Sequence, residues 1–273
     1  MRTSEATATF LAVCHYQDLA KATLANYRWA LARLESHCPE LPRHSDQLLP
    51  VVGARELSRE SKKDLRRILG RFFKWAAKKY KVHNPVPDLE PLPKGRRLLP
   101  EVLEADQVRW LMNVTRSSRD RAMIALVLDT GIRLGELAGL NQRDVGDQLR
   151  VHGKAGTRLV PISDQIRELL QNMGDGPLWI GKKGRLTTEG VRQVFERAFA
   201  NADITGRKTK GPHILRHTFG TFYCRAGGNV RILQEILGHQ DLETTMIYVH
   251  LAGRDVAVDH AQFSPIKTLE LVA

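Results

Sequence analysis

The sequence has few of the features that stabilise disulfide-rich, zinc-binding or membrane-inserted proteins. Its 273 residues contain three cysteines, Cys14, Cys38 and Cys224, which lie far apart and form no C-x-x-C pair. This spacing argues against a disulfide framework or a zinc ribbon and predicts reduced cysteines in packing roles. No apolar run approaches about 18 residues, and no secretory apolar stretch follows Met1. We therefore expect a cytoplasmic protein without membrane segments.

Signals for metal-dependent or nucleotide-driven chemistry are also missing. The sequence has no G-x-x-x-x-G-K-[ST] phosphate loop and no Asp/Glu constellation typical of a Mg²⁺ site. We expect neither ATP nor a metal, and no other cofactor. Internal repeats and low-complexity tracts are absent as well, and a content of 42% hydrophobic and 26% charged residues is that of an ordinary globular protein.

Positive charge is what the chain has in excess. Its 42 Lys and Arg against 30 Asp and Glu give a net charge of +12 and a pI near 9.9, which point to a polyanionic partner, with double-stranded DNA the leading candidate. The proline-rich segment 84–100 predicts a boundary between domains at 1–92 and 101–273, with residues 93–100 as linker. Residues 1–92 carry a net charge of +6, as do the remaining residues 93–273, so the smaller part is more densely basic.

The smaller part is predicted to be helical. Residues 23–38 have an apolar stripe at helical spacing, and residues 61–80 combine such a stripe with many basic residues and a single acid. A basic helix face can be merely a solvated surface. Because of the overall charge, we interpret this face as a surface for the DNA backbone. The residues assigned to DNA contact are Lys62, Lys63, Arg66, Arg67, Arg71, Lys74 and Lys78.

The larger part is predicted to be mostly helical with one small antiparallel sheet, an α+β arrangement. Residues 147–162 alternate as two strands around a glycine-containing turn at 153–156, which places Lys154 near the tip of a hairpin. Helices are expected over 105–114, 118–130, 163–173, 188–202, 213–226, 230–237 and 244–251.

Two short motifs bring arginines to the ends of helices. Arg133 follows a predicted helix end, and Glu136, three residues on, could either fix its guanidinium or be a surface acid. His213 and Arg216 are spaced i, i+3 at the start of a predicted helix, so their side chains should leave one face together, near a helix N-terminus that favours anions. The adjacent His217 is expected to point elsewhere and to serve in packing.

A histidine and a tyrosine complete the set of reactive side chains. His239 follows the helix-ending Gly238 and could be a proton donor or a polar residue bonded to a helix carbonyl. Tyr248, nine residues later, could equally pack within its helix. Its competitors as nucleophile are Tyr16, Tyr27, Tyr80 and Tyr223, none of which has a comparable setting. Two arginines, a lysine, two histidines and a tyrosine are together sufficient to break a phosphodiester without metal.

These motifs resemble the tyrosine recombinase, or phage integrase, family of simple bacterial type. The match runs in order through TGIRLGEL with Arg133 and Glu136, GKAGTRLVPI with Lys154, HILRHTF with His213 and Arg216, LGHQ with His239 and TTMIYVH with Tyr248. The resemblance covers about residues 100–255 and, more weakly, the N-terminal part, which it implies is the helical, SAM-like core-binding domain. It implies that the remainder is the catalytic domain.

The resemblance also implies a reaction. Tyr248 would attack a phosphate to give a 3′-phosphotyrosyl link, with Lys154 as acid for the 5′-oxygen and His213 as acceptor of the phenolic proton. A phenol has a pKa near 10, and we expect nearby cations to favour its ionised form. Both arginines and His239 would stabilise the transition state. Strand exchange through a Holliday junction requires four active sites, so we expect a tetramer assembled on two DNA sites from a protein that is mostly monomeric alone.

Two other functions remain as alternatives. A DNA-binding accessory protein could keep the fold without cutting, although retention of all six residues disfavours it, and a type IB topoisomerase would share the chemistry. The first 92 residues leave no room for the additional arm-binding module of larger phage integrases. The C-terminal tail with Phe263, Ile266, Leu269 and Leu271 could dock onto a neighbouring protomer or simply fray.

Overall fold

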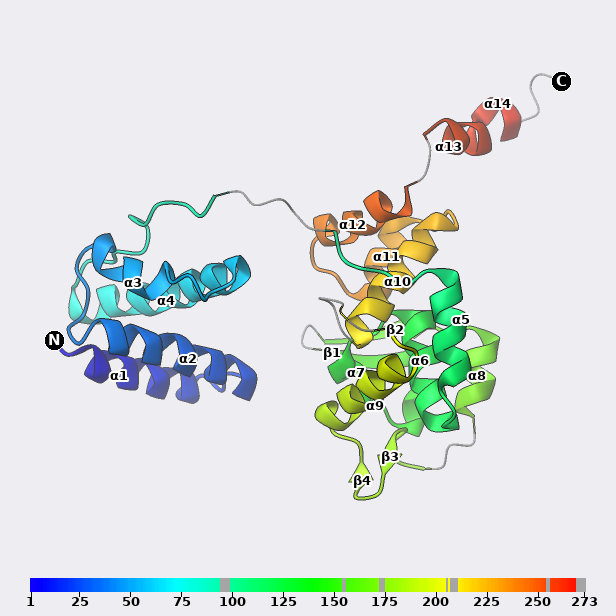
Figure 1. The fold of residues 1–273 in the computed structure, drawn as a ribbon, viewed down its shortest axis with the longest axis horizontal. Coiled ribbons are helices and arrows are strands. Elements are labelled where there is room, and N and C mark those ends of the chain that lie inside the picture. Colours follow the sequence, from blue (N-terminus) through cyan, green and yellow to red (C-terminus); the bar gives the residue numbers. More distant parts are fainter. Residues whose placement is uncertain are drawn as a thin grey trace. The chain divides into compact units, whose positions relative to one another are not determined.

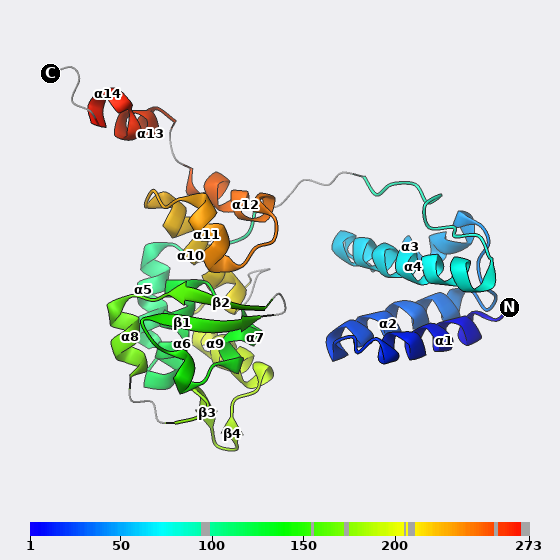
Figure 2. The same ribbon diagram turned by 180° about the vertical axis from the view of Figure 1, so that it is seen from behind.

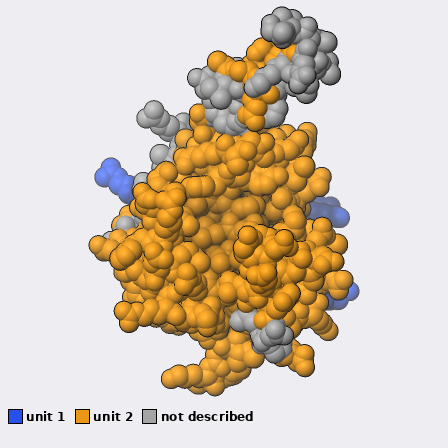
Figure 3. Space-filling view, turned by 90° about the vertical axis from the view of Figure 1, so that its right-hand side faces the viewer, with its two compact units in different colours: residues 1–96 blue, residues 97–273 orange. Residues whose placement is uncertain are grey.

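The chain folds into two compact units, Met1–Arg96 and Arg97–Ala273 (Figure 3). The computed structural model describes residues 1–93, 99–153, 156–171, 175–204, 206, 211–253 and 256–268. Each unit has its own hydrophobic core. Within these ranges, no helix is both long enough and apolar enough to cross a membrane.

The first unit consists of helices packed around an aromatic centre. Its α-helices are α1 (Thr3–Tyr16), α2 (Lys21–His37), α3 (Leu49–Val52) and α4 (Arg59–Tyr80), with a 3₁₀ turn at Ser45–Leu48 (Figure 1). Phe10 of α1 stacks on Tyr27 of α2 at a centroid distance of 5.9 Å and meets Phe72 of α4 edge-on at 5.4 Å. The apolar faces predicted for α2 and α4 are buried, as expected.

Helix α1 was not predicted, although its buried residues do follow helical spacing. They are Thr3, Ala6, Thr7, Phe10 and Cys14. Most of this stripe is small or polar, so a search for large apolar residues does not recognise it. The helix is held by its neighbours instead, since α1 packs on both α2 and α4.

The second unit is mainly helical with two small sheets, which confirms the predicted fold class (Figures 1 and 2). The predicted helices at 105–114, 118–130 and 230–237 have those bounds in the structure, while the second sheet was missed because its strands are two residues each. The elements are α5 (Ala105–Val114), α6 (Ser118–Thr130), α7 (Leu134–Gly139), β1 (Gln148–Gly153), β2 (Gly156–Pro161), α8 (Asp164–Leu170), β3 (Ile180–Gly181), β4 (Gly184–Arg185), α9 (Thr188–Asn201), α10 (Pro212–Arg225), α11 (Val230–Leu237), α12 (Leu242–Ala252), α13 (Val256–Phe263) and α14 (Pro265–Thr268), with a 3₁₀ turn at Gln142–Asp144.

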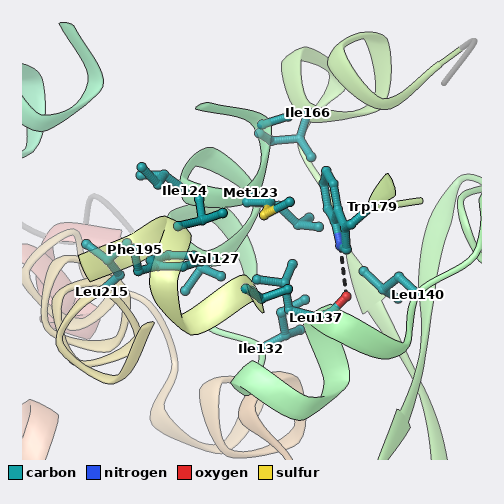
Figure 4. Close-up of a cluster of buried hydrophobic side chains, with 14 of the residues drawn as sticks. Met123, Ile124, Val127, Ile132, Leu137, Leu140, Ile166, Trp179, Phe195 and Leu215 are labelled. Carbon is teal, nitrogen blue, oxygen red and sulfur yellow. Dashed lines mark hydrogen bonds between the residues drawn. The ribbon is translucent and has the colours of Figure 1, made fainter. Parts of the chain in front are cut away.

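A buried tryptophan connects the core of this unit to the short helix α7. Trp179 packs in the cluster that contains Met123 and Val127 of α6, and its Nε1 donates to the Leu137 carbonyl at 2.8 Å (Figure 4). Because Leu137 lies in α7, this bond fixes a helix whose N-cap residue is Arg133. The core therefore positions one of the predicted functional arginines.

The predicted hairpin forms with its strands in regular antiparallel register. Gln148 pairs with Pro161 at one end and Gly153 with Gly156 at the other, and Leu149, Val151 and Val160 are buried. Lys154, predicted near the tip, lies outside the described residues, as do Leu269 and Leu271 of the C-terminal tail.

Candidate active site

The site is built around the C-terminal end of α11, where three arginines bind three consecutive backbone carbonyls. Arg158 Nε donates to the Ile236 carbonyl at 3.0 Å, Arg216 Nη2 to that of Leu237 at 2.8 Å, and Arg133 Nη2 to that of Gly238 at 3.1 Å. The last carbonyls of a helix lack intrahelical partners and carry the negative end of its dipole. This helix end therefore collects cationic groups from three other elements.

Glu136 links two of these arginines and is buried, with 5% of its surface exposed. It accepts from the Arg133 backbone N–H at 2.8 Å and from Arg133 Nη1 at 3.2 Å, and its two oxygens accept from Arg158 Nη1 and Nη2 at 2.8 and 2.9 Å. Burial, the largest single influence, raises the pKa of Glu136, but the bonds from Arg158 and Arg133 outweigh it and leave the pKa below its usual range. Of the two alternatives for Glu136, the geometry supports the one in which it fixes Arg133.

Arg158 was not among the predicted site residues. It lies on β2 two residues before the buried Val160, and side chains two apart on a strand share a face. This alternation directs Arg158 toward the core, where an arginine needs a partner. The signal was therefore present in the strand pattern, whereas the identity of the partner, Glu136, depends on the packing of α7 against β1.

Arg216 lies deepest of the three arginines, with 5% of its surface exposed. Besides the Leu237 carbonyl it binds the Gly131 carbonyl, at the turn between α6 and α7. Burial, reinforced by Arg133, lowers its pKa to about 10, so it stays charged at neutral pH. His213, one turn earlier on α10, is exposed. Partial desolvation and then the charges of Arg216 and Arg133 lower the pKa of His213.

His239 is a neutral hydrogen-bond acceptor for Arg216. Its Nε2 lies 2.8 Å from Arg216 Nη2, and its Nδ1 lies 2.8 Å from Thr245 Oγ1. A guanidinium only donates, so Nε2 must accept and the ring proton must be on Nδ1, directed at Thr245. Burial, followed by the charges of Arg216 and Arg133, lowers the pKa of His239 to about 4, in agreement with this tautomer.

Tyr248 is buried beside these groups, with 1% of its surface exposed. Its ring stacks on that of His239, with centroids 6.3 Å apart and planes within 13°. A Cβ on Gly220 would lie 2.8 Å from the Tyr248 ring, so only glycine fits beneath it without a shift. Among the competing tyrosines, Tyr16 is exposed and Tyr27 belongs to the core of the first unit.

In the free protein, burial of Tyr248 outweighs the nearby arginines, which do favour the ionised phenol as expected. Burial raises the pKa of Tyr248, and the opposing effects of Arg216 and Arg133 do not cancel it. The phenol is therefore protonated at neutral pH, and its activation requires a group that takes the proton.

His217, expected to serve only in packing, contacts the Tyr248 hydroxyl instead. Its Nδ1 lies 3.2 Å from the hydroxyl oxygen, and the two ring centroids are 5.8 Å apart. Burial, followed by the charges of His213 and Arg216, lowers the pKa of His217 to about 4. His217 does point about 100° away from Arg216, as adjacent positions of a helix do. The expectation failed because Tyr248 of α12 packs on that side, and a partner from another helix is not visible in the local sequence.

A cleft of about 1160 Å³, here called the arginine cleft, borders this arrangement on the side of Arg133, Arg158 and His239. Its lining includes Arg133, Glu136, Arg158 and His239, together with Gly153 and Gly156 of the hairpin ends. The cleft thus offers cationic donors to an anion. Within the described ranges, no group of three or more His, Cys, Asp or Glu side chains could hold a metal ion.

In the first unit, the basic residues of α4 that were assigned to DNA contact form two sets, one bonded to backbone carbonyls and one exposed. Lys62 donates to the Gly53 carbonyl at 3.3 Å, and Arg66 donates to the Leu89 carbonyl at 3.0 Å and to that of Glu90, so these two hold backbone segments. The other five are exposed and recur at helical spacing on one face. This basic stripe consists of Lys63, Arg67, Arg71, Lys74 and Lys78.

Comparison with known proteins identifies relatives over most of the chain. A sequence model described as the phage integrase family matches residues 101–254. Tyrosine recombinase XerC of Azotobacter vinelandii is 31% identical over 277 residues, which cover 91% of this chain and 92% of the relative. The Tn1549 transposon integrase in complex with transposon right end DNA has a TM-score of 0.77 at 18% identity, over 98% of this chain and 100% of that one. A lambda integrase tetramer bound to a Holliday junction has a TM-score of 0.72 at 20% identity, over 88% and 78%.

Proposed function

The chain belongs to the phage integrase family, and from this premise we propose that the arginine cleft is where it cuts and rejoins DNA. The protein is a site-specific tyrosine recombinase. The single observation that supports the assignment of the site is the position of Tyr248, whose ring stacks on His239 while His239 accepts a bond from Arg216. The candidate nucleophile thus lies directly behind His239, which lines the cleft, and beside fixed cationic donors.

In the proposed reaction, Tyr248 attacks the scissile phosphate and forms a 3′-phosphotyrosyl link while the 5′-oxygen leaves. Arg133 and Arg216 each retain donors besides those bound to carbonyls, and these would bind the nonbridging oxygens as they gain charge. Lys154 is proposed to protonate the leaving 5′-oxygen. His213, exposed one turn before Arg216, is proposed to contact the phosphate as well. Because the link conserves the energy of the phosphodiester, the reaction needs no ATP.

The two units are proposed to divide the work of binding DNA. Residues 1–92 would be the core-binding domain that contacts the DNA backbone through the basic stripe, residues 93–100 the linker, and 101–273 the catalytic domain. Strand exchange joins two duplexes at four cut sites, so the protein is proposed to act as a tetramer on DNA, as the lambda integrase tetramer does on a Holliday junction. We place this activity in the cytoplasm.

The proposal is tested by trapping the covalent intermediate. The protein is incubated with its target DNA, which carries a nick close to the cleavage site. After cleavage, the short fragment that bears the free 5′-hydroxyl diffuses away, and rejoining is blocked. We expect a denaturant-resistant protein–DNA adduct that Tyr248→Phe does not form. Absence of an adduct with the wild-type protein would rule out the proposed cleavage activity and favour a non-cutting DNA-binding protein.

A second assay separates the recombinase from the topoisomerase alternative, which the relatives do not favour. Supercoiled plasmids with two target sites are incubated with the protein, and the products are resolved on gels. Recombinant circles are expected. Relaxed plasmids without recombinants would indicate a type IB topoisomerase.

A further inference from the structure

The phenolic hydroxyl of Tyr248 has a hydrogen-bond partner that the reaction outlined above does not use. The Nδ1 atom of His217 lies 3.2 Å from the hydroxyl oxygen, and both side chains are largely removed from solvent. His213, the residue expected to receive the phenolic proton, is exposed on the same helix. Among the described residues, His217 is the histidine that contacts the group from which a proton must leave.

The protonation of His217 allows the hydroxyl to donate in this contact. A histidine whose pKa lies at about 4 is neutral at pH 7 and has a free lone pair on one nitrogen. When that lone pair is on Nδ1, the phenolic hydrogen can point at it across the 3.2 Å contact. The positive charge of Arg216 favours negative charge on the phenolic oxygen as this hydrogen leaves.

Building on the proposed cleavage reaction, we propose that His217 is a further catalytic residue that accepts the phenolic proton through Nδ1 as Tyr248 attacks the phosphate. In this step the O–H bond of Tyr248 breaks and an N–H bond forms on His217. The phenolic oxygen bonds to phosphorus while the bond from phosphorus to the 5′-oxygen breaks, and that oxygen takes a proton from the general acid. During rejoining, the same proton returns from His217 to the phenol.

The arrangement explains how a buried phenol can react. Burial stabilises the neutral form of Tyr248, so the charge of the arginines alone does not ionise it before attack. A base already in contact with the hydroxyl removes the proton during the step itself, when the negative charge passes to the phosphate. General base catalysis of this kind contributes about 10²- to 10⁴-fold to a rate.

The test compares two substitutions of His217 in single-turnover cleavage of the nicked target DNA. In His217→Asn the amide can accept a hydrogen bond near the position of Nδ1 but cannot take a proton, and His217→Leu removes both functions. We expect both variants to cleave about 100-fold more slowly than wild type, with unchanged DNA affinity and cooperative thermal unfolding. The control is His260→Asn on α13, an exposed histidine, which should cleave at the wild-type rate.

A second measurement separates proton transfer from simple orientation of the ring. Tyr248 is replaced by a difluorotyrosine, whose phenol is more acidic, in the wild-type and His217→Asn backgrounds. If His217 takes the proton, the more acidic phenol needs it less, and we expect the difference between the two backgrounds to shrink about tenfold. A purely positional role predicts the same difference with either phenol, and that result would overturn the proposal.

The outcomes for His217 and for the cleavage reaction can be told apart. If the wild-type protein forms the adduct and His217→Asn forms it within twofold of the wild-type rate, the role of His217 is refuted while the cleavage reaction stands. If the wild-type protein forms no adduct, the cleavage reaction itself is refuted.

Discussion

Arginines in the two units of this protein are used in opposite ways. On α4, Arg67 has 67% of its side chain exposed, and its ion pair is with Asp64 one turn earlier. In the second unit, Arg216 is 5% exposed and bonds to two backbone carbonyls and to His239. The comparison shows that one residue type can provide either a long-range positive field or a donor held in one position.

The difference has consequences for energy and for tolerance to substitution. Exposed arginines attract a polyanion through screened electrostatics, and each contributes little to folding. The three arginines of the site are anchored to the carbonyls at the end of α11, so that removing one leaves carbonyls without their partners. Substitutions should therefore have small, salt-dependent effects in the first unit and large effects on catalysis and stability in the second.

The largest effect is expected from Arg216→Lys, which keeps the charge but cannot reach the three partners of Arg216 together. Cleavage of nicked target DNA should slow by about 10²- to 10³-fold, because a fixed donor to the phosphate is lost. The matched control is Arg192→Lys on α9, where an exposed arginine pairs with Glu189. If the two variants cleave at equal rates, anchoring of Arg216 by its partners does not matter for cleavage, and the proposed difference between anchored and exposed arginines is wrong.

Glu136→Gln should have the next largest effect, this time on stability. It leaves Arg133 and Arg158 without their shared carboxylate, and breaking a buried ion pair from one side costs about 3 kcal/mol in the free energy of unfolding. Urea titration measures the change. The double variant Glu136→Met/Arg158→Met should lose less unfolding free energy than Glu136→Met and Arg158→Met lose together as single variants. A strictly additive loss would contradict the coupling between Glu136 and Arg158.

The pH dependence of stability should reflect the two buried histidines of the site. His217 and His239 have pKa values of about 4 in the folded protein and near 6.5 when unfolded, so the unfolded chain binds more protons between these values. Stability should therefore fall as the pH drops from about 6.5 toward 4, by on the order of 1 to 3 kcal/mol for each histidine. His239→Asn should flatten this profile in urea titrations at several pH values, and an unchanged slope would indicate that His239 is protonated in the fold.

The smallest effect is expected on the basic stripe. Arg67→Gln should lower the slope of log affinity for DNA against log salt by about 0.9 while leaving the melting temperature nearly unchanged. Arg66→Gln on the same helix should do the reverse, because Arg66 holds the backbone at Leu89 and Glu90. Binding titrations at several salt concentrations and thermal unfolding separate the two, and identical behaviour would show that position on the helix is irrelevant.

Much of the fold could be predicted from periodicity and capping. The bounds of α5, α6 and α11 follow from apolar spacing and from glycines with positive φ after the last two. Helix α1 escaped prediction because its buried stripe is rich in threonine and alanine, which are not distinctive. Where helix propensity is weak, packing against neighbouring helices determines whether a segment folds.

The residues of the site could be predicted in part, because some of them belong to short local motifs. Local motifs supplied Arg133, Arg216, His239 and Tyr248 as candidates, and the structure brings these four together at the end of α11 and on α12. The partners of these residues could not be predicted in this way, since Arg158 reaches Glu136 across 22 positions and His217 reaches Tyr248 across 31.

By itself the sequence determined which side chains are available for the chemistry, the helices that present them and the excess of positive charge. Only the tertiary structure decided which arginines are held and which are free, that burial leaves the Tyr248 phenol protonated, and that His217 rather than His213 contacts its hydroxyl. The physical reason is that composition and periodicity depend on residues near in sequence. Desolvation and hydrogen bonding at a buried group depend on whatever the fold packs against it.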